Sequence, residues 1–316
     1  MTTEGKIALI FPGQGSQVAG MGKELVEKYP LARQTFAEAD AVLGYKLSEV
    51  CFDGPEDQLR LTEITQPAIL TTSIAALRVL ETRMPKPAFV AGHSLGEYSA
   101  HVAAGTFSFA EAVRTVRNRG KYMQEAVPVG VGAMAAILGM GLEKVAGVCQ
   151  DAAQGEVCSP ANINSPEQVV ISGNTAAVER AAKLADERGA KRAKLLPVSA
   201  PFHCSLMKPA QDRLEVDLKA LRMSKPVYPV ASNVDAELVI DEIRAFQTLV
   251  RQVTGSVKWD PCMRLLIGQG VETFIEVGPG RVLCGLMRQI DRTQTCLNVA
   301  DEASLGKTLD SLARPG

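Results

Sequence analysis

The feature that most constrains the fold is a serine placed between a short apolar run and a helical pattern. Residues 88–92 (AFVAG) predict a buried strand, and residues 96–105 (GEYSAHVAAG) follow with helical spacing. Between them, residues 92–96 (GHSLG) have the G-x-S-x-G spacing of a nucleophile elbow, in which a sharp strand-to-helix turn exposes the serine hydroxyl. This pattern predicts an α/β fold with Ser94 as nucleophile. The N–H of Leu95, at the start of the helix, can donate to a developing oxyanion.

A second glycine-rich turn follows the first predicted strand. Residues 6–11 (KIALIF) are a short apolar run, and residues 12–17 (PGQGSQ) come directly after it. Glycine lets a backbone approach a ligand closely, so the N–H of Gln14 is the candidate second oxyanion donor. The turn does not match a dinucleotide-binding loop, because the third glycine of G-x-G-x-x-G would fall on Val18, and no Walker lysine follows.

A serine nucleophile needs a general base, and the chain has only 3 histidines. His93 adjoins Ser94 on the turn, so its side chain should leave in another direction. His101 lies about two helical turns further on, roughly 10 Å along the axis, which is too far to touch the hydroxyl. His203 lies between a predicted strand and a predicted helix, where catalytic side chains are usually mounted. It is therefore the candidate base, and a buried structural histidine is the alternative.

One arginine falls beside the apolar face of a helix that the sequence phases well. Ser108 and Glu111 form an S-x-x-E capping box, which predicts a helix from residue 109 to about 126. At 100° per residue the apolar stripe includes Met123, and Arg119 lies on its flank. An unpaired buried charge costs several kcal/mol, roughly 3 to 5. Arg119 must therefore pair with an acid of the protein or with a substrate carboxylate gripped by its planar fork, and the sequence leaves both open.

The remaining patterns indicate a second unit inserted into a larger α/β domain. Residues 128–197 show the order strand, helix, strand, strand, helix, strand of a ferredoxin-like unit. The predicted domains are residues 1–127 with 198–316 as the catalytic part, and the insertion between them. A long helix is predicted over residues 65–83, with Pro67 near its first turn, and strands resume with VYPVASN and TFIEVG.

Composition describes a globular protein without a bulk electrostatic field. Of the 316 residues 46% are hydrophobic and 22% charged, and the formal net charge is -1, which argues against recruitment by nucleic acid or an anionic membrane. We find no signal-peptide core and no apolar run of the roughly 20 residues that a spanning helix needs. The 7 cysteines show no metal-ligand spacing and are expected to be free thiols. We expect a cytoplasmic monomer without a metal or tightly bound cofactor.

These motifs together resemble the malonyl-CoA:acyl carrier protein transacylases of bacterial fatty-acid synthesis. The similarity runs nearly end to end, in the order FPGQGSQ, TQPA, GHSLGEYSA, RGKYMQEA, PANINSPEQVVISG, PVSAPFHCSLMKPA, LVRQ and EVGPG. It implies an α/β-hydrolase-like core with a ferredoxin-like (βαββαβ) insertion. It also implies malonyl-CoA and acyl carrier protein as partners.

The resemblance also implies a role for each matching position. Ser94 would be the nucleophile and His203 the acid and base, oriented by the main-chain carbonyl of Gln252 rather than by a carboxylate. The oxyanion amides would be those of Gln14 and Leu95. The implied substrate-binding residues are Arg119, for the malonyl carboxylate, with Met123, Asn162 and Phe202. Phe202, beside the histidine, resembles the pattern of malonyl-selective acyltransferases.

The implied reaction is a ping-pong transfer through a malonyl-serine intermediate. Two rivals stay open from the sequence. A serine hydrolase or thioesterase with the same elbow is expected to have an Asp or Glu that orients His203 and no cation that faces the acyl group. A catalytically dead scaffold that only binds carrier protein would not need Ser94 and His203 intact.

Overall fold

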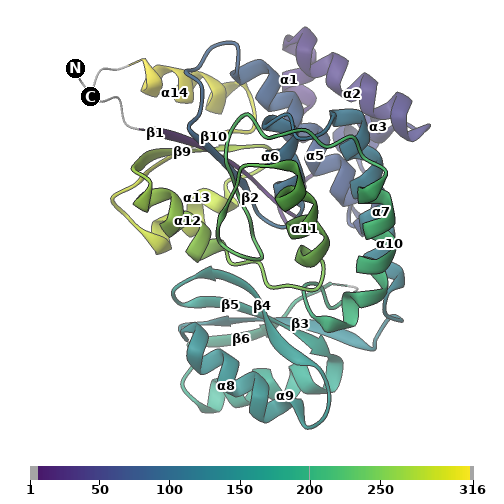
Figure 1. The fold of residues 1–316 in the computed structure, drawn as a ribbon, viewed down its shortest axis with the longest axis vertical. Coiled ribbons are helices and arrows are strands. Elements are labelled where there is room, and N and C mark those ends of the chain that lie inside the picture. Colours follow the sequence, from purple (N-terminus) through teal and green to yellow (C-terminus); the bar gives the residue numbers. More distant parts are fainter. Residues whose placement is uncertain (1–5, 199, 314–316) are drawn as a thin grey trace.

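The computed structural model describes residues 6–198 and 200–313, and they form a larger α/β body with a smaller α/β unit packed against it (Figure 1). The strands are β1 Lys6–Phe11, β2 Phe89–Gly92, β3 Gly132–Leu138, β4 Cys158–Ser165, β5 Gln168–Asn174, β6 Arg192–Leu195, β7 Val230–Ala231, β8 Leu238–Val239, β9 Val271–Val277 and β10 Thr295–Val299. The helices are α1 Lys23–Lys28, α2 Pro30–Leu43, α3 Leu47–Asp53, α4 Glu56–Leu59, α5 Thr62–Leu80, α6 Leu95–Ala103, α7 Phe109–Glu125, α8 Leu142–Ala153, α9 Thr175–Glu187, the 3₁₀ turn η1 Ser205–Met207, α10 Lys208–Lys219, α11 Glu242–Gln252, α12 Trp259–Gly268, α13 Val282–Ile290 and α14 Glu302–Leu312.

The larger sheet has the order β10-β9-β1-β2-β7-β8 and is parallel except for the pair β7 and β8. Its central strand β1 pairs Leu9 with Val90 of β2 and with Ile275 of β9. In a parallel sheet the strands end at the same edge, where α/β proteins bind their ligands. The turns that follow β1 and β2 are therefore side by side at this edge. The prediction that both turns supply oxyanion donors needs this proximity.

The smaller sheet has the order β4-β5-β3-β6, and all of its pairs are antiparallel. Helices α8 and α9 cover one of its faces (Figure 1). Along β5, Val169 and Ile171 join the apolar cluster under these helices, whereas Val170 between them packs into the core of the larger body. The sequence of elements is strand, helix, strand, strand, helix, strand, as predicted for residues 128–197.

Two predicted elements differ from the structure. Helix α5 begins at Thr62 rather than near residue 65, so Pro67 lies inside the helix and not in its first turn. The strand predicted from VYPVASN is reduced to Val230–Ala231, because Pro229 cannot donate a ladder hydrogen bond. None of the helices within residues 6–198 and 200–313 is long and apolar enough to cross a membrane.

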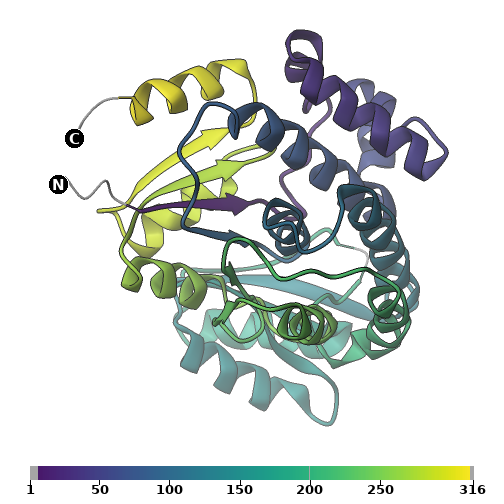
Figure 2. The same ribbon diagram turned by 45° about the horizontal axis from the view of Figure 1, so that its top comes forward.

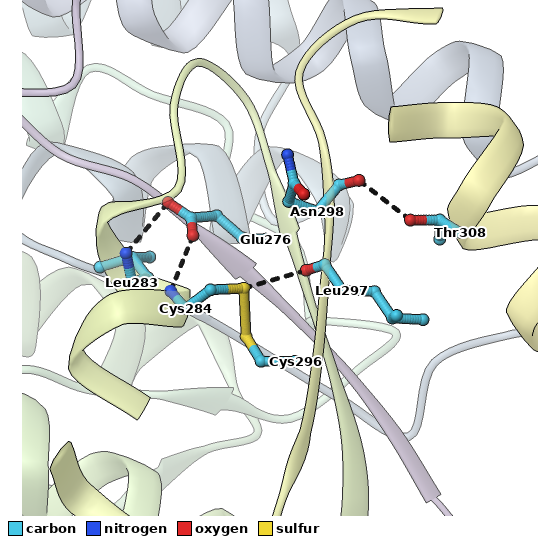
Figure 3. The surroundings of a disulfide bond; sticks show 7 residues. All are labelled: Glu276, Leu283, Cys284, Cys296, Leu297, Asn298 and Thr308. Atoms are coloured by element: carbon cyan, nitrogen blue, oxygen red, sulfur yellow. Dashed lines mark hydrogen bonds between the residues drawn. A yellow bond between two sulfur atoms is a disulfide. The ribbon is translucent and has the colours of Figure 1, made fainter. Parts of the chain in front are cut away.

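The expectation of seven free thiols is wrong for two cysteines. Cys284, in the first turn of α13, forms a disulfide with Cys296 of β10 (Figure 3). The carboxylate of Glu276 on β9 accepts hydrogen bonds from the N–H groups of Leu283 and Cys284 and so caps the same helix. Because the two cysteines meet through the packing of α13 on the edge of the sheet, their spacing of 12 residues gave no sign of it.

Candidate active site

The strand-to-helix turn places Ser94 at the carboxyl edge of the larger sheet. Its backbone has φ 52° and ψ −104°, a conformation that is strained for a residue with a side chain. The turn closes because the flanking positions are glycines: a Cβ on Gly92 would lie 1.9 Å from the carbonyl oxygen of Gly96, and one on Gly96 2.1 Å from that of Phe11. The N–H of Ser94 donates to Oδ1 of Asn233 at 2.7 Å, which fixes the turn from the segment just after β7.

His203 reaches the serine hydroxyl from the loop before η1. Its Nε2 lies 2.7 Å from Oγ of Ser94, and its Nδ1 lies 2.9 Å from the carbonyl oxygen of Gln252 and 3.2 Å from that of Gly255. A carbonyl oxygen can only accept, so Nδ1 carries the proton and Nε2 is free to accept the serine proton. Burial, and then the nearby charge of Arg119, lower the pKa of His203 to about 3. The ring is therefore a neutral base at neutral pH.

Arg119 is buried beside Ser94, on the face of α7 that packs against the core. Its guanidinium donates to Oε1 of Gln66 at 2.8 Å, to Oε1 of Gln252 at 2.9 Å and to Oγ of Ser94 at 3.1 Å. These are all neutral acceptors, and within the described part of the chain Arg119 forms no ion pair with an acid. The side chain is 1% exposed, and burial lowers its pKa. The sequence left two partners for Arg119 open, an acid of the protein or a substrate carboxylate. Among the described residues the first of these is not found.

The loop after β1 lies directly against the turn that carries the serine. A Cβ on Gly13 would be 2.3 Å from the carbonyl oxygen of His93, so this close approach requires glycine. Gln14 follows on the exposed side of the loop, and Leu95 is the first residue of α6. Across the described residues no acceptor is recorded for the N–H of Gln14 or of Leu95. Both amides are thus available at the edge where Ser94 lies.

The chain matches the family model for the acyl transferase domain over residues 8–310. It is 49% identical to the malonyl CoA-acyl carrier protein transacylase of Salmonella typhimurium, over 96% of this chain and 99% of that protein, and 48% identical to that of Bacillus subtilis, over 97% of each. The chain belongs to the malonyl-CoA:acyl carrier protein transacylase family. The similarity therefore covers almost the whole chain, including the segments that contain Ser94 and His203.

Solved structures of transacylases have the same fold. An acyl carrier protein S-malonyltransferase from Vibrio cholerae superposes with a TM-score of 0.94 at 50% identity, over 96% of this chain and 99% of that one. A malonyl-transacylase solved in complex with a type II PKS acyl-carrier protein gives a TM-score of 0.95 at 47% identity, over 97% and 99%. The arrangement of a parallel-rich sheet beside an antiparallel sheet is thus common to transacylases of this type.

The other three residues implied by the transacylase resemblance lie around the same loops. Met123, one turn beyond Arg119 on α7, is buried, and its sulfur accepts from Nε2 of Gln66 at 3.8 Å. Phe202 precedes His203 and is buried. Asn162 on β4 is half-buried, and its Oδ1 has no hydrogen-bond partner among the described residues.

Sequence reasoning missed the polar residues that hold this transacylase site together. Gln66 binds Arg119, Asn233 binds the N–H of Ser94, and Glu97 accepts from the side chain of Gln252 at 2.7 Å. Gln66 and Glu97 stand inside the quoted motifs TQPA and GHSLGEYSA, so their presence in an ordered motif was the available signal. Nothing in the sequence pointed to Asn233.

Proposed function

We propose that this chain transfers the malonyl group of malonyl-CoA to the phosphopantetheine thiol of acyl carrier protein through a malonyl-serine intermediate. The observation that carries the proposal is the buried guanidinium of Arg119, which touches Oγ of Ser94 and binds no carboxylate among the residues that the structure describes. An acyl group with a carboxylate at its far end would supply the missing anion.

In the first half-reaction Ser94 attacks the thioester carbonyl. Its hydroxyl proton passes to Nε2 of His203, and the N–H groups of Gln14 and Leu95 hold the oxyanion of the tetrahedral intermediate. The intermediate collapses by breaking the carbon–sulfur bond, and the sulfur of CoA leaves with the proton from His203. The carbonyl of Gln252 keeps the ring in the correct tautomer throughout.

In the second half-reaction the carrier-protein thiol gives its proton to His203 and attacks the malonyl ester. The oxyanion forms in the same place, the carbon–oxygen bond breaks, and Ser94 recovers its proton. Water loses this competition because the thiol is the better nucleophile and because Arg119 fixes the acyl group for attack. We assign Met123, Asn162 and Phe202 to the walls of the acyl pocket, on the support of their places around these loops.

The geometry of the site also differs from that of a hydrolase with the usual Ser-His-acid triad. Nδ1 of His203 donates to main-chain carbonyls, where such a hydrolase would place an acid, and Arg119 would face the acyl group.

We further propose that residues 1–127 and 198–316 form an α/β-hydrolase-like core and residues 128–197 a ferredoxin-like domain. The parallel sheet around the elbow and the order β4-β5-β3-β6 support these descriptions. A cytoplasmic monomer stays a prediction from the sequence.

The first test of the proposal is acyl selectivity in Arg119→Ala. Loss of the charged hydrogen bonds to the malonyl carboxylate should cost about 3 kcal/mol, on the order of 100-fold in kcat/KM for malonyl-CoA. Acetyl transfer should fall far less, because acetyl has no carboxylate. Steady-state transfer from both acyl-CoAs to carrier protein measures the ratio. Arg114→Ala, an exposed arginine of the same helix, is the matched control and should leave the ratio unchanged.

The intermediate is tested by mass spectrometry of the peptide that contains Ser94 after incubation with malonyl-CoA. We expect a lasting malonyl adduct that carrier protein discharges. Rapid release of free malonate without an acceptor would favour the hydrolase, and equal loss of malonyl and acetyl transfer in Arg119→Ala would make that residue structural.

A further inference from the structure

Gln252, the last residue of α11, contacts the base, the nucleophile and the guanidinium at once. Its main-chain carbonyl accepts from Nδ1 of His203, and its side-chain oxygen Oε1 accepts from Arg119. Its side-chain nitrogen Nε2 donates to the main-chain carbonyl of Ser94 at 2.9 Å and to Oε2 of Glu97 at 2.7 Å. A shift of this residue would therefore move both the base and the group that we assign to the malonyl carboxylate.

The orientation of this side-chain amide depends on its neighbours. A carboxamide has an acceptor end and a donor end, and rotation by half a turn exchanges them. Arg119 offers only donors at one end of Gln252, whereas the carbonyl of Ser94 and the carboxyl of Glu97 offer acceptors at the other. Only one orientation satisfies all three contacts. Without Glu97, a single acceptor would be left to hold the donor end.

Glu97 is costly to bury and has no evident structural use for its second oxygen. Its side chain is 0% exposed, and Oε1 has no hydrogen-bond partner within the described part of the protein. A buried polar atom without a partner destabilises a fold, so an apolar residue of this size would serve packing better. Oε2, in contrast, accepts from Nε2 of Gln252 and from the main-chain N–H of Asn233 at 3.2 Å.

We propose that Glu97 is a positioning residue for the transfer reaction, which fixes the side chain of Gln252 so that His203 and Arg119 are both held in place. The proposal rests on the proposed malonyl transfer, because it assigns Arg119 to the acyl carboxylate. Glu97 touches neither the nucleophilic oxygen nor the base and acts through Gln252.

The acceptor, and not the charge, is what this role requires. Burial raises the pKa of Glu97 to about 7, so the carboxyl is ionised only in part at neutral pH. Because Oε2 already receives two N–H groups, a bound proton belongs on Oε1, and Oε2 accepts in either state. A neutral carboxamide at this position can therefore replace the carboxyl.

The test compares Glu97→Met, which keeps the volume and removes the acceptor, with Glu97→Gln, which keeps an acceptor without a charge. Ser99→Ala is the matched control, because Ser99 is a fully buried polar residue of the same helix whose Oγ has no partner among the described residues. Circular dichroism verifies folding. If Glu97→Met does not fold, Glu97→Asp replaces it, since the shorter side chain withdraws the acceptor from Gln252.

Two readouts are measured: the rate at which a fluorophosphonate labels Ser94, and the ratio of malonyl to acetyl transfer. A misplacement of about 1 Å can cost on the order of 100-fold in rate. We expect losses of this order in labelling by Glu97→Met, together with a lower malonyl-to-acetyl ratio. We expect Glu97→Gln to recover both to within about fivefold.

The proposal would be overturned if a folded Glu97→Met or Glu97→Asp protein had the same labelling rate and the same malonyl-to-acetyl ratio as the wild-type protein. It would also be overturned if Ser94 were labelled as slowly in Glu97→Gln as in Glu97→Met, because a neutral acceptor would then not be enough to hold Gln252. The labelling assay needs no acyl-CoA. It therefore tests the role of Glu97 even if the wild-type protein transfers no malonyl, which is the result that would defeat the proposed function instead.

Discussion

At the scale of single residues, His101 is a buried histidine that takes no part in the proposed chemistry. It is 0% exposed on α6, its Nδ1 lies 3.0 Å from Oγ1 of Thr106, and its ring lies beside that of Phe107. Its Nε2 has no hydrogen-bond partner among the described residues. Burial lowers the pKa of His101 to about 3, so the native protein keeps this ring neutral in mild acid.

Replacing His101 with glutamine should flatten the pH dependence of stability. Below the ordinary histidine pKa of about 6.5 the unfolded chain binds a proton that the native ring refuses, so the free energy of unfolding falls as the pH drops toward 3. One such group accounts for about 2 kcal/mol between pH 6.5 and pH 5. We expect the fall between pH 7 and pH 5 to be smaller by this amount in His101→Gln. Urea unfolding at both pH values measures it, and an unchanged fall would contradict the assignment.

The residues that we propose to carry the chemistry were easier to find from the sequence than the residues that hold them in place. Ser94 stands in a motif with its own backbone requirement, and His203 was reached by elimination because histidine is rare in this chain. The structure brings the two side chains within 2.7 Å of each other, which supports the proposed roles. Glutamine and asparagine side chains have no periodic signature, so the contacts of Gln66 and Asn233 became visible only with the fold.

At the scale of elements, the position of Arg119 depends on how closely α7 packs on α5. The contact point is Gly120, where a Cβ would lie 2.5 Å from the main-chain oxygen of Thr62. The two backbones therefore meet with no room for a side chain. Any separation of these helices moves the guanidinium away from the serine.

Gly120→Ala should destabilise the protein by about 1 to 3 kcal/mol and reduce malonyl transfer, because overpacking forces the helices apart. Gly147→Ala is the matched control: Gly147 lies inside α8, and a Cβ there would meet nothing within 4 Å. It should be neutral or stabilise by about 0.5 to 1 kcal/mol. Thermal unfolding and transfer assays compare the two, and similar effects would show that the contact at Gly120 is not tight.

Element boundaries were predicted well where a local signal exists. The capping box of Ser108 and Glu111 placed the start of α7, and both of its hydrogen bonds are present. The start of α5 was placed too late, because Pro67 suggested a first turn and the N-cap residue, Leu61, provides no side-chain cap. A helix whose first turns are stabilised by burial, and not by a capping side chain, has no local sequence signal at its start.

At the scale of the whole molecule, the disulfide between Cys284 and Cys296 ties helix α13 to the edge strand β10. Alkylation of the denatured protein without reductant should modify five cysteines, those at 51, 149, 158, 204 and 262, and all seven after reduction. Closing a loop of this size should stabilise the fold by about 3 kcal/mol, so reductant should lower the unfolding midpoint. Seven labelled cysteines without reductant would rule the bond out.

The overall arrangement followed from the sequence only in part. The order of elements in residues 128–197 and the strand, turn and helix at the elbow were predictable, because hydrophobic periodicity and turn residues mark them. Strand order was not, since it depends on contacts between distant segments. The junction of the two units is an example: Ile163 of β4 and Val257 pair through a main-chain hydrogen bond of 2.8 Å, and Nε2 of His93 lies 2.8 Å from Oδ1 of Asn164.

The guanidinium of Arg119 has one more consequence, for work at the bench. A buried cation that meets only neutral groups among the described residues attracts whatever small anion the solution offers. Phosphate or polycarboxylate buffers such as citrate would then compete with the acyl donor at the resting site and raise the apparent KM. Kinetic constants from different laboratories become comparable only when the ionic composition of the assay is held constant.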